Sequence, residues 1–131
     1  MTDLNGSGQL SLFVGGRVIP GRFPEAASSL LFLQTNDNWV LDVENTKALA
    51  KVGLVNGAVF SDLDGDGQAD LVLACDWGPV RVFRNEKGRL AAWDPPVQLP
   101  TSHLVPLSSL AGWWHGVTTG DLDGDGRLDI I

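Results

Sequence analysis

The chain has 131 residues, a net charge of −7 at pH 7 and a single cysteine, Cys75. One cysteine excludes a fold held together by disulfide bonds, and the excess of acidic residues argues against nucleic-acid binding. No apolar run approaches about 18 residues, so the sequence predicts no membrane span.

The first recognisable element is the polar loop "DLNGSGQLSLF", which begins at Asp3 and runs into the apolar stretch "LSLFVGG". Oxygen-bearing groups recur at its positions 1, 3, 5, 7 and 9, which is the ligand spacing of a calcium loop. These groups are Asp3, Asn5, Ser7, the Gln9 carbonyl and Ser11. They carry one formal negative charge, and calcium affinity follows ligand charge. We therefore expect this first loop to bind calcium weakly or not at all.

A connection containing "RVIPGRFPEAAS" follows, and then "SLLFLQTNDNWVLDV" (29–43). The second stretch has β-forming residues on both sides of Asn36-Asp37-Asn38, which predicts a β-hairpin. The segment "GLVNGAVFS" (53–61) predicts a further strand that leads into the next loop.

The second loop, "DLDGDGQAD" (62–70), concentrates four carboxylates within nine positions. Carboxylates this close repel one another unless a cation neutralises them. The expected calcium ligands are Asp62, Asp64, Asp66, the backbone carbonyl of Gln68, and Asp70. Magnesium prefers a smaller octahedral shell, and zinc or iron would need histidine or cysteine. A metal-free Asp/Gly turn is the alternative, but a turn needs only one or two such residues.

The apolar run "DLVLAC" (70–75) and the segment "VRVFRNEKGRLAAW" (80–93) predict a buried strand and a second hairpin turning at 85–88. After a connecting segment, "GWWHGVTTG" (112–120) leads into a third loop with the full ligand pattern. Its expected ligands are Asp121, Asp123, Asp125, the backbone carbonyl of Arg127, and Asp129.

The three loops are spaced 59 residues apart, which indicates a repeat architecture. Each repeat supplies about four short strands, the content of one propeller blade. The sequence thus predicts an all-β fold of antiparallel blades with calcium-binding hairpin loops. Residues 1–131 are expected to be part of one β-propeller domain, with repeats at 3–61, 62–120 and, truncated, 121–131. A closed propeller needs about four to eight blades, so we expect an incomplete propeller from a longer protein.

A helical calcium-binding hand is the main structural alternative, since it shares the opening of the loop. Such a loop needs glutamate at position 12, where the second loop has Leu73 and the first has Val14. The residues that follow are β-formers without helical periodicity. The helical alternative is therefore disfavoured.

The D-x-D-x-D-G-x-x-D loops resemble the FG-GAP/VCBS repeats of integrin-α-like β-propellers. The stretches "LFVGGRVIPGRFP", "DWGPVRVFRN" and "GWWHGVTTGDLDGDGRLDI" are similar to bacterial VCBS-repeat proteins of the ASPIC/UnbV type. The resemblance implies that the calcium hairpins share one face of the propeller, with partners on the other face or the rim. It implies no catalytic residues.

We expect a calcium-binding segment of a larger extracellular, periplasmic or cell-surface protein, since calcium loops of modest affinity suit those settings. The expected role is a scaffold for protein or glycan recognition and adhesion, with Ca²⁺ as the only cofactor and no enzymatic activity in this chain. Two alternatives stay open: the non-catalytic part of a propeller enzyme such as a polysaccharide lyase, and a purely structural repeat segment. No signal peptide is recognisable in this chain.

Two further features concern packing. Cys75 ends an apolar run and is expected to be a small core residue. Trp113 and Trp114 could hold a sugar or a peptide if exposed, but we favour packing between blades, because aromatic side chains mostly fill cores.

Overall fold

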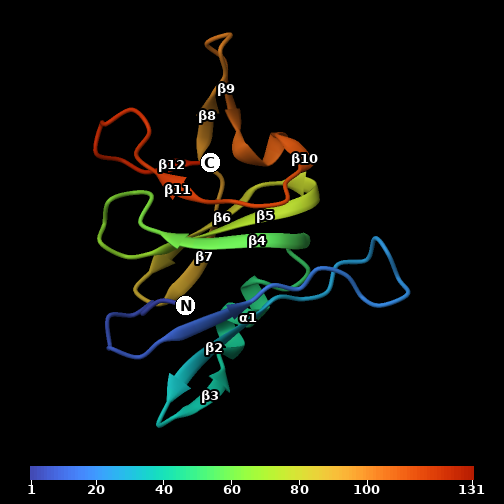
Figure 1. Cartoon of the computed structure of the whole chain (residues 1–131), viewed down its shortest axis with the longest axis vertical. Helices are drawn as coiled ribbons and strands as arrows, with labels where there is room; N and C mark the ends of the chain where they lie inside the picture. Colours follow the sequence, from blue (N-terminus) through green and yellow to red (C-terminus); the bar gives the residue numbers. More distant parts are fainter.

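The computed structural model describes all residues, 1–131, and shows a molecule built almost entirely from short antiparallel strands (Figure 1). In chain order the elements are β1 (Ser11–Val14), β2 (Leu30–Thr35), β3 (Asn38–Leu41), α1 (Val43–Ala48), β4 (Leu54–Ser61), β5 (Asp70–Pro79), β6 (Arg81–Glu86), β7 (Arg89–Trp93), β8 (Pro96–Gln98), β9 (Leu104–Pro106), the 3-10 helix η1 (Leu107–Ser109), β10 (Ala111–Trp113), β11 (Thr119–Gly120) and β12 (Asp129–Ile130). No helix is both long enough and apolar enough to cross a bilayer.

The sheets follow one another along the long axis of the molecule (Figure 1). Strands β1, β2 and β3 form one antiparallel sheet, and β4, β5, β6 and β7 form the next, with β10 added at the far end of β5. Strands β11 and β12 begin a third sheet, and β8 pairs with β9 in a separate hairpin. No sheet closes on itself. The all-β, incomplete propeller expected from the repeats is confirmed, and β4 to β7 show the four-strand blade most fully.

Both predicted hairpins are present, and their turns explain why. Strands β2 and β3 are joined by Asn36 and Asp37, with φ of 45° and 64°, and β6 and β7 by Lys87 and Gly88, with φ of 55° and 95°. Two consecutive positive φ angles match the right-handed twist of the flanking strands. Asparagine, aspartate and glycine adopt this conformation more readily than other residues.

Two connections contain regular structure that the sequence pattern did not predict. The segment after β3 forms the six-residue helix α1, whose N-cap Asp42 accepts a hydrogen bond from the Asn45 amide at 3.1 Å. The segment after β7 forms the β8–β9 hairpin and η1. Both elements are too short to produce a readable hydrophobic period, so their propensity alone did not distinguish them from loops.

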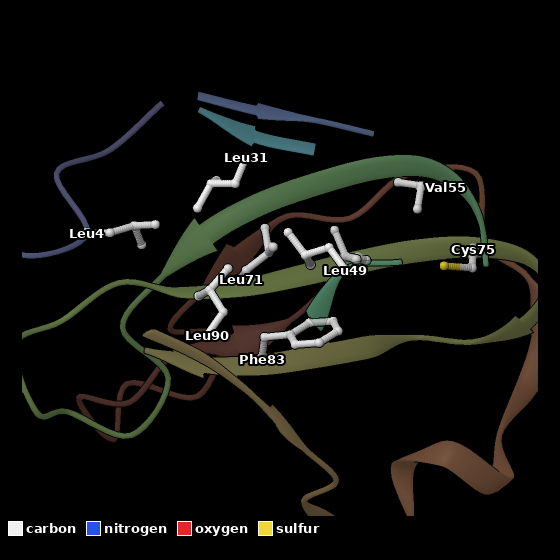
Figure 2. Close-up of a cluster of buried hydrophobic side chains, with 9 residues drawn as sticks. Leu4, Leu31, Leu49, Val55, Leu71, Cys75, Phe83 and Leu90 are labelled. Carbon is white, nitrogen blue, oxygen red and sulfur yellow. The ribbon is translucent and has the colours of Figure 1, made fainter. Parts of the chain in front are cut away.

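Strand β5 lies at the centre of the core. The five residues from Leu71 to Cys75 are all buried, so both faces of this strand are covered. Leu71, Leu73 and Cys75 belong to a cluster that includes Leu31 from β2 and Leu49 just after α1 (Figure 2). This cluster packs the first sheet against the second. The prediction that Cys75 is a core residue is confirmed, and burial raises the pKa of its thiol.

Two buried asparagines hold neighbouring parts of the chain together. Asn85 donates from Nδ2 to the Leu4 carbonyl at 2.8 Å and accepts from the Gly88 amide at 2.7 Å. Asn45 donates to the Gly88 carbonyl and accepts from the Leu90 amide, both at 2.8 Å. Their amide groups satisfy backbone groups that would otherwise be buried without partners. They thereby place the first polar loop and α1 against the β6–β7 hairpin.

Candidate metal centres in the acidic loops

The three polar loops project from the same side of the molecule (Figure 1). The second loop connects the end of β4 to the start of β5, where Ser61 and Asp70 are paired across the antiparallel ladder. This pairing places the last residue of the loop next to the residue that precedes its first. One carboxylate oxygen each from Asp62, Asp64 and Asp70 therefore lies within 4.8 Å of the others. Three of the four predicted carboxylates of this loop are brought together.

The backbone of the second loop curls around the carboxylate of Asp62. The amides of Gly65 and Asp66 donate to its Oδ1 at 2.9 and 3.1 Å, and the amide of Gly67 donates to its Oδ2 at 2.9 Å. Gly65 and Gly67 have φ of 76° and 85°, a left-handed conformation that glycine adopts without steric cost. The loop is thus shaped by its own hydrogen bonds around the first predicted ligand.

The fourth carboxylate of this loop, Asp66, lies outside the group of three. Its Oδ1 accepts from the Gln68 amide at 2.8 Å, and its Oδ2 accepts from the Gln68 side chain at 3.1 Å. Gln68 in turn accepts at Oε1 from the Lys87 amide at 2.7 Å, which ties the loop to the β6–β7 turn. The assignments of Asp66 and of the Gln68 backbone carbonyl as ligands stay predictions.

The third loop repeats the hydrogen bonds that curl the second loop around its first aspartate. Asp121, Asp123 and Asp129 bring one carboxylate oxygen each within 4.8 Å of one another. The amides that donate to Asp121 at 2.7, 3.2 and 2.9 Å belong to Gly124, Asp125 and Gly126. Asp125 accepts from the amide of Arg127 at 2.8 Å, as Asp66 does from Gln68. The periodicity seen in the sequence therefore reflects a repeated three-dimensional structure.

The first loop has the same turn without the carboxylate cluster. Asp3 accepts from the amides of Asn5, Ser7 and Gly8 at 3.2, 3.2 and 2.6 Å, and the Gly8 contact is the main reason that its pKa is lowered. Ser7 Oγ accepts from the Gln9 amide at 3.3 Å, and Ser11 is buried in β1. The turn forms around Asp3, its one acidic side chain, so it does not gather negative charge.

The two acidic clusters differ in burial. Asp70 is 0% exposed, and its carboxylate accepts from the Asn85 amide at 2.8 Å and the Leu63 amide at 3.1 Å. Its pKa is nevertheless raised, because desolvation by burial outweighs those two hydrogen bonds. Asp129 is only half-buried, and it accepts from the Leu122 amide at 2.9 Å. Because Asp70 is fully buried beside two other carboxylates, the electrostatic repulsion in the absence of a cation is larger in the second loop than in the third.

The donor set of both clusters fits a hard cation. Every side-chain atom that converges in them is a carboxylate oxygen, and neither contains histidine or cysteine. Hard divalent ions such as calcium bind oxygen ligands of this kind in loops with the same spacing.

The second and third loops are neighbours. A cleft of about 230 Å³ lies between them, lined by Asp62 to Gly65 on one side and Gly126 to Leu128 on the other. The hydroxyl oxygens of Ser61 and Thr119, just before each loop, lie 2.8 Å apart. This contact aligns the two loops at adjoining edges of the second and third sheets.

Arg84 is a residue near the second loop that the sequence analysis did not identify. It lies on β6, and its Nε is 2.9 Å from Oδ2 of Asp64. Twenty residues separate the two in sequence, and only the pairing of β5 with β6 places them side by side. A comparison of loop motifs alone contains no signal for such a contact.

The tryptophans ahead of the third loop are exposed within this chain. Trp113 is 70% exposed and stacks on Trp77 with ring centroids 6.4 Å apart, while Phe23 meets Trp77 edge-on at 5.2 Å. Trp114 is 39% exposed as well, so neither side chain is buried within residues 1–131, and packing of both between blades stays a prediction. Strand β10 pairs with the end of β5 beyond the core, and its register shifts between Gly112 and Trp113, so no sheet covers this side chain.

We predict that the first loop becomes a calcium site when its missing charges are restored. The double substitution Ser7→Asp and Ser11→Asp places carboxylates at positions 5 and 9 of a turn that is already formed. Calcium affinity rises with ligand charge, so titration calorimetry should show one site more than in the unsubstituted chain. An unchanged number of sites in a folded double variant would show that the first loop is not positioned for metal binding.

Comparison with known families matches residues 62–131, more than half of the chain, to the family described as FG-GAP-like repeat. The matched segment starts at the first aspartate of the second loop and includes the third loop and both acidic clusters. Searches of curated proteins and of solved structures found no match. Because the family covers most of the second sheet and both acidic loops, the chain belongs to the FG-GAP-like repeat family.

Proposed function

We propose that this chain is a calcium-binding segment of a β-propeller, in which metal ions hold the second and third loops closed. One observation carries the proposal: each loop brings three carboxylate oxygens within 4.8 Å of one another on a backbone already curled around its first aspartate. Clustered carboxylates repel one another, and a bound divalent cation converts that repulsion into attraction.

The residues proposed to hold the ions follow the shared pattern of the loops. In the second loop they are Asp62, Asp64, Asp66, Asp70 and the carbonyl of Gln68, and in the third loop Asp121, Asp123, Asp125, Asp129 and the carbonyl of Arg127. A bound calcium ion would neutralise the negative charge of these aspartates at the point where each loop leads into a strand. Its binding would hold the connection between β4 and β5 and that between β11 and β12, and so stabilise each antiparallel pair where its loop begins and ends.

The proposed biological role is that of a non-catalytic scaffold in a larger repeat protein, with repeats at 3–61, 62–120 and 121–131. In repeat proteins each repeat packs on its neighbours, and the core cluster that joins the first and second sheets supports that arrangement here. We propose recognition of protein or glycan partners outside the cell or in the cell envelope, where calcium concentrations suit such loops.

Calorimetric titration of the chelator-stripped chain tests this proposal. We expect at least two calcium sites, with magnesium competing poorly because it needs a smaller octahedral shell. Circular dichroism in the same buffer provides the control that the stripped protein keeps its β-structure. Folded protein that releases or absorbs no heat on calcium addition, and shows no stabilisation by calcium in thermal unfolding, would contradict metal binding at these loops.

A further inference from the structure

Two adjoining pockets lie between the first and second repeats. One, the β5 pocket, has a volume of about 380 Å³ and lies at the start of β4 and the end of β5, away from the second acidic loop (Figure 1). The other, the α1 pocket, has a volume of about 340 Å³ and lies between α1 and strands β6 and β7. Both volumes are in the usual range of small-ligand sites. The lining residues all fall between 24 and 108, so neither pocket is formed by the first or last residues of the chain.

Each pocket has one tryptophan in its wall. Trp77 lines the β5 pocket, and Phe23 meets its ring edge-on with centroids 5.2 Å apart. Trp77 has φ of 55° and no partner in β10, because the register shifts at this point. A bulky residue rarely adopts this conformation, and a bulge of this kind redirects a side chain. Trp93 lines the α1 pocket, and Arg84 stacks over its ring at 4.3 Å. Two aromatic side chains are thus presented in neighbouring pockets.

Two cationic side chains lie where the pockets meet. Lys51 and Arg81 line both pockets. Lys51 is paired with Glu25 at 3.4 Å, whereas Arg81 is exposed and forms no ion pair. The carboxylate of Asp94 also lines the α1 pocket, but it accepts from the amide and the hydroxyl of Ser108 at 2.8 and 2.6 Å. The guanidinium of Arg81 is therefore available to an anionic group placed between the two pockets.

The carboxylate in the wall of the β5 pocket is engaged as well. Asp76 is paired with Arg17 at 2.9 Å, and its side chain is only 10% exposed. The repulsion between this carboxylate and an incoming anion is therefore offset within the chain. Arg81 leaves the junction of the pockets locally positive, although the chain as a whole has a net charge of −7.

We propose that these pockets bind an acidic oligosaccharide, with one sugar ring against each tryptophan and a uronate carboxylate at Arg81 and Lys51. This inference rests on the recognition role in the proposed function, and not on its calcium sites. The C–H groups on one face of a pyranose carry partial positive charge and pack on the negative face of an indole ring. The planar guanidinium of Arg81 binds a carboxylate through two parallel hydrogen bonds.

The order of aromatic wall, cation and aromatic wall favours an oligosaccharide over other anions. An acidic glycan carries carboxylates between successive rings, a repeat that an inorganic anion or a single nucleotide lacks. An acidic peptide supplies the charge, but its carboxylate side chains have no flat apolar face to place against Trp77 and Trp93. The sugar rings and the charge are both needed to fill the two pockets and their junction.

NMR titration of the isotopically labelled whole chain with a hyaluronan hexasaccharide, which alternates glucuronate and N-acetylglucosamine, tests the proposal. We expect shifts at the amides of Gly53 and Gly78, which line the β5 pocket, and at the indole N–H groups of Trp77 and Trp93. A neutral chitin hexasaccharide should bind about tenfold more weakly, because it makes no charged hydrogen bond. A hexapeptide of glutamate should also bind more weakly, because it cannot stack. Added salt should weaken the binding of the acidic oligosaccharide.

Substitutions inside and outside the pockets test the assigned contacts. Arg81→Gln should weaken binding about tenfold by removing the charged hydrogen bonds, and Arg81→Lys should weaken it less, since the charge is kept. Trp77→Gly should also weaken binding about tenfold. Glycine adopts φ of 55° without strain, so this variant should stay folded. Arg89→Gln is the matched control and should leave the affinity unchanged, because it removes a positive charge at the start of β7, outside both pockets.

The outcomes are distinct when the titration is done in excess calcium and again after chelation. The proposal is overturned if the chitin hexasaccharide or the glutamate peptide binds as tightly as the hyaluronan hexasaccharide, or if Arg81→Gln binds as tightly as Arg89→Gln. Shifts confined to Gly65 and Gly67 in calcium would place the oligosaccharide on the second loop and would also overturn it. If calcium binds but no oligosaccharide does, this inference fails while calcium binding stands. If the oligosaccharide binds but calcium does not, the inference stands and the proposed metal sites fail.

Discussion

Replacing Leu71 by alanine should lower the free energy of unfolding by about 2–5 kcal/mol, the usual cost of removing a large aliphatic side chain from a closed core. Leu71 is 0% exposed and lies in β5, with partners from the first sheet, from β6 and from β7 in one cluster. The loss combines buried apolar area with the cavity that rigid neighbours leave behind. Urea unfolding monitored by tryptophan fluorescence, in excess calcium, measures it.

The matched control is Leu104→Ala. Leu104 lies in β9 and is 68% exposed, so the same chemical change should alter stability by less than about 0.5 kcal/mol. A small effect of Leu71→Ala, comparable to that of the control, would show that the first and second sheets do not share one core. The cooperative packing of neighbouring repeats would then have to be reconsidered.

Replacing Asp62 by alanine should remove calcium binding at the second loop, with a loss in affinity of about a hundredfold or more. The substitution removes one ligand and one of four negative charges, on which calcium affinity depends. It also deprives the amides of Gly65, Asp66 and Gly67 of their shared acceptor, so the loop loses the hydrogen bonds that shape it. Calorimetry should show one site fewer, and the third loop should still bind.

Glu86→Ala is the matched control for this loss of charge. Glu86 is an exposed carboxylate at the end of β6, close to the same loop in the fold but outside the group of convergent oxygens. Its removal should change calcium affinity by a small, salt-dependent factor. Retention of both sites in Asp62→Ala would mean that Asp62 serves only as a structural cap of the turn.

Features that depend only on residues close together in the sequence could be predicted from it. The hairpin turns at Asn36-Asp37 and Lys87-Gly88 were predictable because few residues adopt two successive positive φ angles. The three loops were recognisable because their spacing and their glycines are local properties of the chain. The strand after the second loop was also predictable, since an unbroken apolar run indicates a strand covered on both faces.

The sequence by itself thus determined the repeat, the strand order within a blade and the acidic loops, because local turns and periodic patterns specify them. The tertiary structure alone decided which charges meet and which aromatic side chains stay exposed. Arg84 reaches Asp64 through the pairing of β5 with β6, and Asp66 turns toward Gln68 instead of joining the other carboxylates. Trp113 is exposed because β10 pairs beyond the core. These outcomes depend on register and on the packing of distant segments, which neither composition nor spacing encodes.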